Sequence, residues 1–513
     1  MVSKIYTAAL YGIDGYEVTV ECSGWDRIPK FDLVGLPDAA VKEAKNRVTS
    51  ACENSGFRFP ALDLVVNLAP ADRKKEGSAF DVAILLAILQ CHGTLPSSLE
   101  LTDCCFLGEL SLSGEVRAVG GVLPMCIAAR RDGRRRVFVP QANAAEAAVI
   151  EGLTVYGVSH MRELIAHLKG EAPIEPTAPT AVSLSGERRS TVGDFSEVKG
   201  QLKAKRALEV AAAGGHNVLM IGPPGSGKSM LAKRLPSILP DMSFEEALET
   251  TAVHSVMGLL RQSLVTERPF RSPHHTVSPI GMIGGGITPR PGEISVAHNG
   301  VLFLDELPEF PKSVTEALRQ PLEDGEVTIT RAASKVTFPS SFMLVCAMNP
   351  CRCGFFGDPR RTCTCAPGAV QKYLERVSGP LLDRIDIQIE LPSIAYRDMA
   401  SKAPGEPSAA IRERVNRARA FAADRLRRDG RNPAILNANL PQAALRAYCT
   451  PDRAAQELLQ TAFDKLGLSA RGHDRILRVA RTIADMEGCA VIGADHVSEA
   501  IMYRALDRKY WHR

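Results

Sequence analysis

The feature that most constrains the fold is the segment Gly-Pro-Pro-Gly-Ser-Gly-Lys-Ser at residues 222–229. The apolar run 217–221 before it suits a buried strand, and residues 230–235 after it continue as a helix. Glycines at these spacings let the loop turn so that its backbone N–H groups point at one spot, next to the positive end of the helix dipole. The sequence therefore predicts a phosphate-binding loop (P-loop) within an α/β unit.

A second segment supplies the predicted catalytic carboxylates. The apolar run 301–304 ends at Asp305 and Glu306. With a P-loop upstream, Lys228 would reach the β and γ phosphates, Ser229 and Asp305 would hold Mg²⁺, and Glu306 would polarise the attacking water. An acidic pair at a strand end can otherwise be a helix N-cap, but the P-loop favours ATP hydrolysis. The residues predicted to bind the nucleotide are Gly222, Pro223, Pro224, Gly225, Ser226, Gly227, Lys228 and Ser229.

Composition sets limits around this site. The chain has 513 residues, 45% of them hydrophobic, which is enough for three or so globular domains. A net charge of +4 is too small to establish nucleic-acid binding by itself. No run of eighteen uncharged apolar residues exists, and the first residues lack the apolar core of a signal peptide. We expect a cytoplasmic protein with no membrane partner.

Four of the thirteen cysteines are close together in the sequence. Two close pairs across a short loop can give four thiolates to a tetrahedral Zn²⁺, and a site without an open position would be structural. Scattered or regulatory thiols and an iron–sulfur cluster are the alternatives. The predicted zinc ligands are Cys351, Cys353, Cys363 and Cys365.

Proline-rich and glycine-containing stretches divide the chain. Residues 170–190 are rich in Pro, Thr, Ala and Ser, which is typical of an exposed linker, and a softer boundary lies at 401–408. The predicted parts are an N-terminal domain at 1–168, a linker at 169–192, an ATPase core at 193–400 with the cysteine loop at 351–365, and a helical lid at 401–513.

Periodicity predicts the class of the outer domains. In the N-terminal part, strand-like runs at 16–21 and 62–67 alternate with helical runs at 41–54 and 80–89, as in an α/β or α+β domain. Residues 411–430 favour a helix with seven arginines and three acids, either a solvated surface helix or one that faces DNA. Four further helical segments follow, at 442–448, 452–465, 473–487 and 494–503.

Together with the P-loop, several motifs make the whole chain resemble the YifB/ComM family of magnesium-chelatase-like AAA+ ATPases. This resemblance implies an AAA+ core with a helical lid, preceded by a Lon-protease-like (S5-like) α+β domain, and a ring, usually a hexamer, with ATP between subunits. The motifs are Val34–Asp38, Val66–Asp72, Arg268–His275, Ala347–Cys351, Leu381–Asp386 and Ser469–Gly472.

The resemblance assigns roles to further residues. Asn349 matches the sensor-1 position, Arg384 resembles the arginine finger that acts in the adjacent subunit, and Arg471 resembles the sensor-2 arginine of the lid. Residues 326–338 have the pattern of a hairpin with a basic tip, at the position of the pore hairpin of the MCM-like branch. Arg331 and Lys335 would then grip DNA phosphates independently of sequence, although a plain surface hairpin has the same pattern.

Two further features, the N-terminal domain and a pair of adjacent histidines, do not predict a catalytic or metal site. The N-terminal domain resembles that of Lon, but the best alignment places Ala79 at the nucleophile and Leu123 at the position of the activating lysine, so we expect a scaffold for assembly and DNA binding. His274 and His275 are adjacent, with side chains expected to diverge, and no cluster of carboxylates lies nearby. We expect them to pack a loop.

These inferences favour a ring-forming ATPase that couples ATP hydrolysis to DNA translocation and branch migration when incoming DNA is recombined. The expected cofactors are ATP, Mg²⁺ and structural Zn²⁺. The expected partners are single-stranded and branched DNA, other copies of the chain, and recombination proteins. The alternatives are a magnesium-chelatase-type motor, which would help insert Mg²⁺ into a porphyrin, and an ATP-dependent protein remodeller.

Overall fold

The computed structural model describes residues 2–180, 193–286, 289–331, 334–393, 405–466 and 468–511, without the side chains of Arg331, Ser334, Leu466 and Arg508. It separates into two compact units. Unit 1 comprises Met1–Leu184 and Ser243–Thr266, and unit 2 comprises Ser185–Met242 and Glu267–Arg513. Residues 181–192 of the predicted linker and 401–404 of the second predicted boundary lie outside the described residues.

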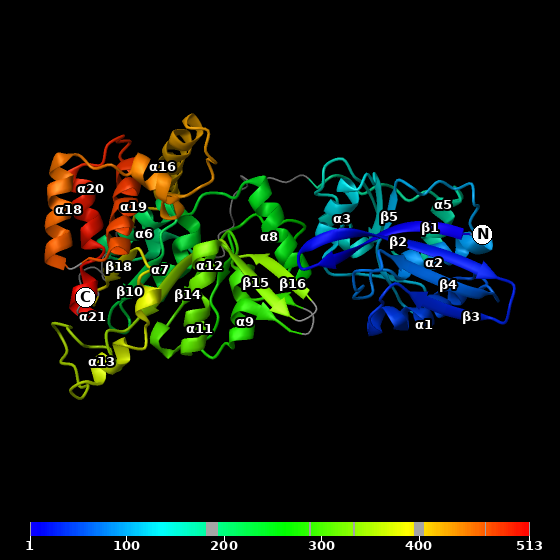
Figure 1. Cartoon of the computed structure of the whole chain (residues 1–513), viewed down its shortest axis with the longest axis horizontal. Helices are drawn as coiled ribbons and strands as arrows, with labels where there is room; N and C mark the ends of the chain where they lie inside the picture. Colours follow the sequence, from blue (N-terminus) through cyan, green and yellow to red (C-terminus); the bar gives the residue numbers. More distant parts are fainter. Residues whose placement is uncertain are drawn as a thin grey trace. The chain divides into compact units, whose positions relative to one another are not determined.

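Unit 1 is built on two main sheets, which lie in the blue and cyan part of Figure 1. One has the order β1-β2-β4-β3, and the other is the parallel sheet β5-β8-β9. The strands are β1 Val2–Tyr11, β2 Asp14–Trp25, β3 Lys30–Val34, β4 Asp63–Ala69, β5 Cys104–Phe106, β6 Glu109–Leu110, β7 Val116–Arg117, β8 Arg136–Pro140 and β9 Thr154–Val158. The helices are α1 Ala39–Asn54, α2 Asp81–His92, α3 Val122–Arg131, α4 Ala144–Ala147, α5 Met161–Leu168 and α8 Phe244–Val256.

Helix α8 comes from the middle of the predicted ATPase core, but it packs in unit 1. Ser243 and Glu246 form a capping box that starts the helix. Its Leu248 lies against the apolar cluster around α3, and the Ser255 hydroxyl donates to the Glu146 carboxylate. Glu146 also accepts the backbone N–H of Leu123 at 3.1 Å. Tertiary packing therefore joins a segment of the core sequence to the N-terminal unit.

Unit 2 contains a five-stranded parallel sheet with the order β11-β14-β17-β10-β18. Its inner strands are continuous apolar runs because both faces of a parallel sheet are covered. The strands of unit 2 are β10 Val218–Ile221, β11 Phe270–Arg271, β12 Gly284–Gly285, β13 Arg290–Pro291, β14 Val301–Leu304, β15 Glu326–Arg331, β16 Ser334–Pro339, β17 Met343–Met348 and β18 Ile387–Glu390.

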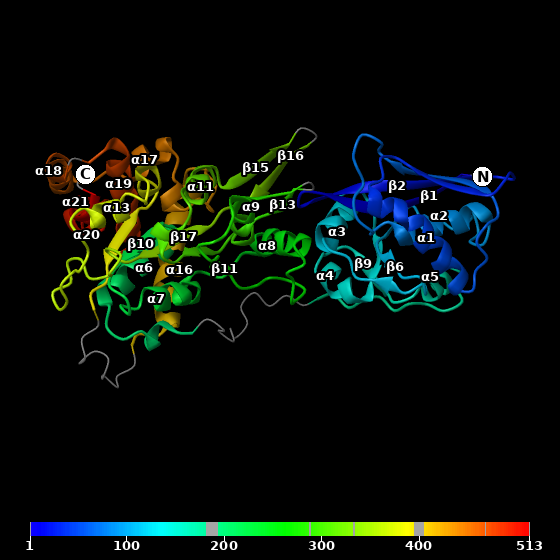
Figure 2. The same ribbon diagram turned by 90° about the horizontal axis from the view of Figure 1, so that it is seen from below.

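Short helices surround this sheet and connect its strands (Figure 1). They are α6 Leu202–Gly214, α7 Lys228–Arg234, α9 Pro279–Ile283, α10 Glu293–Val296, α11 Lys312–Ala317, α12 Arg319–Asp324, α13 Ala369–Leu374 and α14 Gly379–Leu382. The predicted hairpin is present as β15 and β16, which Figure 2 shows as a ribbon that extends from the body of unit 2. Val327, Ile329, Val336 and Phe338 are buried on one face of this ribbon.

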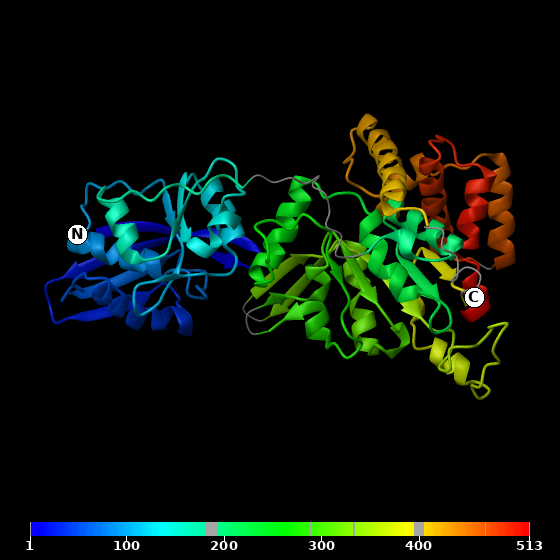
Figure 3. The same ribbon diagram turned by 180° about the vertical axis from the view of Figure 1, so that it is seen from behind.

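The predicted C-terminal helices are confirmed, with small shifts at their ends. Figure 3 shows them in orange and red at the end of unit 2. The C-terminal helices are α16 Ser408–Arg428, α17 Gln442–Tyr448, α18 Arg453–Leu466, α19 Ala470–Met486, α20 Ala494–Met502 and α21 Leu506–Trp511. The last of them, α21, is an element that periodicity did not predict.

Three of the seven arginines of α16 contact partners in other parts of unit 2. Arg414 pairs with Glu209 and Glu406, Arg419 donates to the carbonyl of Ala212, and Arg425 pairs with Asp485. The helix buries Ile411, Val415, Ala418 and Leu426. Arg417, Arg427 and Arg428 are exposed, so internal pairing reduces the basic face of this helix without removing it.

Candidate functional site

The P-loop connects β10 to α7 at the carboxyl end of the parallel sheet. Gly225 and Gly227 have φ angles of +77° and +92°, a region in which only glycine is unstrained. At Gly222 a side chain would not fit, because a Cβ would lie 2.4 Å from the carbonyl oxygen of Leu391. The loop has the strand-loop-helix setting that the sequence predicts.

Lys228 bridges the P-loop and the end of β17. Its Nζ donates to the carbonyl oxygens of Gly222 and Pro223 at 2.7 and 2.9 Å and to Oδ1 of Asn349 at 3.2 Å. Burial lowers the pKa of Lys228 to about 8, and the nearby carboxylate of Asp305 opposes this shift. A buried ammonium with little compensating charge is well suited to bind a phosphate anion.

Ser229 and Asp305 meet at the start of α7. The Ser229 hydroxyl donates to Oδ2 of Asp305 at 2.6 Å, and Oδ1 accepts the backbone N–H of Glu306 at 3.0 Å. The structure thus places side by side the hydroxyl and the carboxylate that the sequence assigns to Mg²⁺. Oxygen donors of these two kinds fit Mg²⁺, which usually takes one or two protein ligands besides water and phosphates.

Glu306 has a backbone conformation that is unusual outside glycine, with φ at +54°. Its side chain is 58% exposed, and its Oε2 lies 3.8 Å from Nδ1 of His275. The rings of His274 and His275 lie side by side with centroids 4.1 Å apart, so the expectation that they diverge is wrong. The segment after β11 brings His275 near Glu306, although the two residues are far apart in the sequence.

Arg384 and Arg471 share a second cluster, formed by α14 and the start of α19. Arg384 is buried, donates to the carbonyl of Pro380 at 2.8 Å and pairs with Glu323. Burial lowers the pKa of Arg384, Glu323 opposes this, and the charges of Arg319, Arg471 and Arg475 lower it further. None of the hydrogen bonds or ion pairs described for Arg384 and Arg471 reaches the P-loop.

The four cysteines converge in the loop between β17 and α13, at the lower left of Figure 1. Cys351 Sγ lies 3.3 Å from Cys353 Sγ and 3.7 Å from Cys363 Sγ, and the latter two atoms are 3.5 Å apart. All four sulfur atoms lie within 4.8 Å of one another. Tetrahedral Zn–S bonds of about 2.3 Å require sulfur separations of about 3.8 Å, so the geometry fits Zn²⁺.

The electrostatics of the loop favour the thiolate form at Cys353, whereas burial favours the neutral thiol at Cys351. The backbone N–H of Phe355 is the largest influence on Cys353, and with other donors it lowers the pKa of that thiol to about 5. Burial raises the pKa of Cys351 to about 12. Backbone N–H groups directed at sulfur are the usual outer partners of metal-bound thiolates.

The predicted DNA-gripping residues lie on the β15–β16 ribbon. Lys335 is exposed on β16, while the side chain of Arg331 lies outside the described residues. In unit 1, Ser78 donates to the Glu109 carboxylate, and Lys75 donates to the carbonyl oxygen of Arg73 at 2.8 Å. None of these contacts joins Ser78 to a lysine.

Gln201 is a further residue of this region, and the sequence analysis missed it. Its Nε2 donates to the carbonyl of Ser226 at 3.1 Å and to that of Pro392 at 2.9 Å, which ties the P-loop to the segment after β18. Its φ of +53° places it at the tight turn before α6. The only signal of Gln201 in the sequence is that the pair Gly200-Gln201 directly precedes a helical pattern.

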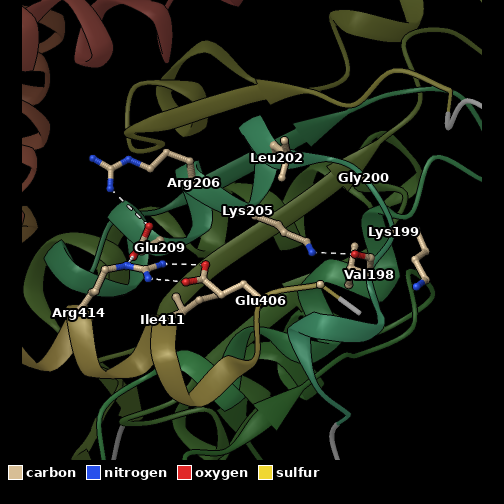
Figure 4. Close-up of a pocket in the computed structure, with 11 residues that line it drawn as sticks. Val198, Lys199, Gly200, Leu202, Lys205, Arg206, Glu209, Glu406, Ile411 and Arg414 are labelled. Carbon is tan, nitrogen blue, oxygen red and sulfur yellow. Dashed lines mark hydrogen bonds and ion pairs between the residues drawn. The ribbon is translucent and has the colours of Figure 1, made fainter. Parts of the chain in front are cut away.

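A cavity of about 290 Å³ lies beside this turn, between α6 and the start of α16 (Figure 4). Ion pairs link Arg414 with Glu209 and Glu406, and Arg206 with Glu209 at 3.4 Å. Lys205 donates to the carbonyl of Val198 at 2.7 Å. The lining holds four basic side chains and two carboxylates, so its charge is net positive, although Lys205, Arg206 and Arg414 already have partners in the protein.

Comparisons with known proteins place this geometry in context. Three regions match family profiles: residues 194–399 match magnesium chelatase subunit ChlI, residues 18–143 match subunit ChlI of Mg-chelatase, and residues 405–504 match the C-terminal part of that subunit. A Lon protease of Rhizobium meliloti is 33% identical over 146 residues, which are 26% of this chain and 18% of that protease. In the described residues, no helix is both long and apolar enough to cross a membrane.

Two relatives match nearly the whole chain. The uncharacterized protein YifB of Escherichia coli is 42% identical over 514 residues, covering 99% of this chain and 98% of YifB. The competence protein ComM of Haemophilus influenzae is 42% identical over 511 residues, covering 98% of this chain and 97% of ComM. With these relatives and all three ChlI regions, the chain belongs to the magnesium-chelatase-like AAA+ family that includes YifB and ComM.

Proposed function

We propose that this protein is an ATP-hydrolysing motor that forms a ring, usually a hexamer, translocates on DNA and drives branch migration when incoming DNA is recombined. The observation that carries the proposal is the convergence of Lys228, Ser229, Asp305 and Asn349 at one edge of the parallel sheet. Membership of the family supports an ATPase, and the name of ComM, a competence protein, supports a role with DNA.

Each side chain has a distinct task in this mechanism. Lys228 holds the β and γ phosphates with its buried ammonium, and Ser229 with Asp305 would hold Mg²⁺. When bound, Mg²⁺ neutralises charge that develops on the phosphates. Glu306 orients the attacking water and takes up its proton, while Asn349 orients that water from the end of β17.

The ring supplies the remaining groups. Arg384 would stabilise the transition-state charge in the neighbouring subunit, and Arg471 would report nucleotide state from the lid. The described partners of Arg384 are Arg319, Pro380 and Glu323, none of them in the P-loop, which supports an action of Arg384 between subunits. The tips of the β15–β16 ribbons, with Arg331 and Lys335, would face DNA in the channel and bind phosphates without reading sequence.

The cysteine loop would hold Zn²⁺ through Cys351, Cys353, Cys363 and Cys365. The sulfur separations support this assignment. Four protein ligands leave no open position, so the metal would stabilise the loop without taking part in hydrolysis.

A branch-migration assay tests whether the protein is an ATP-driven DNA motor. Purified protein should convert a labelled four-way DNA junction into duplex products when ATP is supplied. The matched control is Glu306→Gln, which keeps the size of the side chain, should bind ATP, and should neither hydrolyse ATP nor convert the junction. Junction conversion by the Glu306→Gln variant would contradict the assignment of Glu306 to ATP hydrolysis. Absence of conversion by a wild type that hydrolyses ATP would contradict the branch-migration proposal.

The ChlI matches favour one alternative, a motor of the magnesium-chelatase type. DNA distinguishes the two. A translocase should hydrolyse ATP faster when single-stranded or branched DNA is added, whereas a chelatase motor should be indifferent to DNA and respond to a porphyrin-binding partner.

A further inference from the structure

A glycine of the cysteine loop, Gly354, lies directly against the P-loop. Gly354 has a φ of +86°, and a Cβ at this position would lie 2.5 Å from Cδ and 2.8 Å from Cγ of Pro224. The proline ring is rigid and bonded to the backbone nitrogen, so it could not move aside as the end of a long side chain does. The backbone of Gly354 is therefore in close contact with the P-loop, and only glycine fits there.

The contact leads directly to the groups that hold Lys228. Pro224 follows Pro223, whose carbonyl oxygen accepts the Lys228 ammonium at 2.9 Å. A push on the ring of Pro224 would move this carbonyl, because φ is fixed at both prolines and the two residues share a peptide bond. The cysteine loop can thus act on the position of the lysine that is predicted to bind phosphate.

A second connection runs through β17. Asn349 accepts Lys228 Nζ at 3.2 Å, and two residues later Cys351 is completely buried as the first of the four cysteines. The backbone N–H of Gly354 donates to the carbonyl of Cys351 at 3.0 Å, which closes a turn between the cysteine and the glycine. The conformation at Cys351 therefore influences both Asn349, which contacts Lys228, and Gly354, which contacts Pro224.

Regular secondary structure does not hold the loop, and its other described side-chain hydrogen bonds centre on Asp358, which accepts the N–H groups of Arg360 and Arg361 and the Ser393 hydroxyl. Between β17, which ends at Met348, and α13, which begins at Ala369, the described residues contain no helix or strand. Most side chains from 352 to 368 are exposed or half-buried. A long loop without secondary structure needs a local cross-link to keep one conformation, and four thiolates around one metal ion provide it.

We propose that metal binding by the four cysteines controls nucleotide affinity, because it holds Gly354 against Pro224 and Asn349 against Lys228. Gly354 is then a positioning residue that acts through the P-loop. The inference rests on the proposed ATP and Zn²⁺ sites, but it concerns affinity alone and does not depend on hydrolysis, DNA or ring formation.

Two glycine variants of the full chain test the contact. Gly354→Ala puts a methyl group into Pro224, whereas the matched control Gly357→Ala has the same positive φ in the same loop and would meet only the end of the Lys509 side chain, at 4.0 Å. Both variants lose a glycine in the left-handed region, so only the Pro224 contact differs between them. The measured quantities are zinc per chain and the affinity for a fluorescent ADP analogue.

We expect both variants to keep one zinc per chain. Gly354→Ala should bind the ADP analogue at least about tenfold more weakly than Gly357→Ala, because overpacking against a rigid neighbour costs enough to change an equilibrium constant by that factor. Equal affinities in the two variants would overturn the inference.

Metal removal provides a test that does not depend on the folding of any variant. Wild-type protein from which a zinc-selective chelator has removed the metal should lose affinity for the ADP analogue, and Zn²⁺ alone should restore it. Unchanged affinity after metal loss, or a wild type that contains no metal, would overturn the inference. A wild type that binds no nucleotide at all would instead refute the proposed ATPase, so the two failures are distinguishable.

Discussion

Asp386 joins three parts of unit 2, and its replacement by asparagine should cost more stability than any surface change. Its Oδ1 accepts Arg475 Nη1 at 2.5 Å, and its Oδ2 lies 3.2 Å from Nδ1 of His216 and accepts the N–H of Asn217 at 3.3 Å. These partners come from α19 and from the segment before β10. Asp386 therefore fixes the lid and the P-loop strand to the start of β18.

The size of the effect follows from burial. The Asp386 side chain is 4% exposed, that of Arg475 16% and that of His216 0%. Asp386→Asn keeps the shape but removes the charge that compensates Arg475, and it turns an –NH₂ group toward groups that are donors. Removing one partner of a buried ion pair costs about 3 kcal/mol or more. We expect a loss of about 3 kcal/mol in the unfolding free energy of unit 2.

The matched control is Asp424→Asn on α16. Asp424 also pairs with an arginine, Arg427, but their side chains are 55% and 64% exposed. An exposed pair of this kind contributes about 0.5 kcal/mol. The two variants make the same chemical change and differ in burial.

The assay uses the positions of the tryptophans. The chain has two: Trp25 in unit 1 and Trp511 in α21 of unit 2. In a Trp25→Phe background, which replaces a side chain that is 45% exposed, Trp511 fluorescence reports unfolding of unit 2 in urea. If Asp386→Asn were no less stable than Asp424→Asn, the reasoning from burial would be refuted.

The pH dependence gives an independent check. Burial alone would raise the pKa of Asp386, but Arg475 and His216 outweigh it and hold the pKa well below its ordinary value. A depressed folded-state pKa stabilises the protein above the unfolded pKa of about 4, and this contribution is lost as the pH falls below it. The stability difference between wild type and Asp386→Asn should therefore shrink below pH 4.

Three further predictions concern the proposed sites. Because the pKa of Lys228 is about 8 and a bound phosphate would raise it, nucleotide affinity should fall about tenfold between pH 7 and pH 9 in equilibrium titrations, and a flat profile would contradict this. Arg331→Ala with Lys335→Ala should keep basal ATPase activity but lose its stimulation by DNA; full stimulation would exclude the hairpin as the DNA contact. Cys351→Ser with Cys363→Ser should release the metal, and equal zinc content in variant and wild type would end that assignment.

Short-range patterns were enough to predict much of the fold. The P-loop has its strand before it and its helix after it, and α17 begins and ends where periodicity placed it. Such elements follow from residues a few positions apart, through apolar periodicity, glycine at positive φ and capping side chains. The same locality brought the two cysteine pairs within one loop.

Only the tertiary structure decided which of these elements meet. Strand order brings Asp305 to Ser229 and Asn349 to Lys228 across long stretches of sequence, because parallel strands end at one edge of a sheet. Packing also assigns α8 to unit 1, although its neighbours in the sequence belong to unit 2. Pairing engages three arginines of α16, and close approach places Gly354 on Pro224. These contacts depend on where a side chain finds its partner in space, which no local pattern in the sequence encodes.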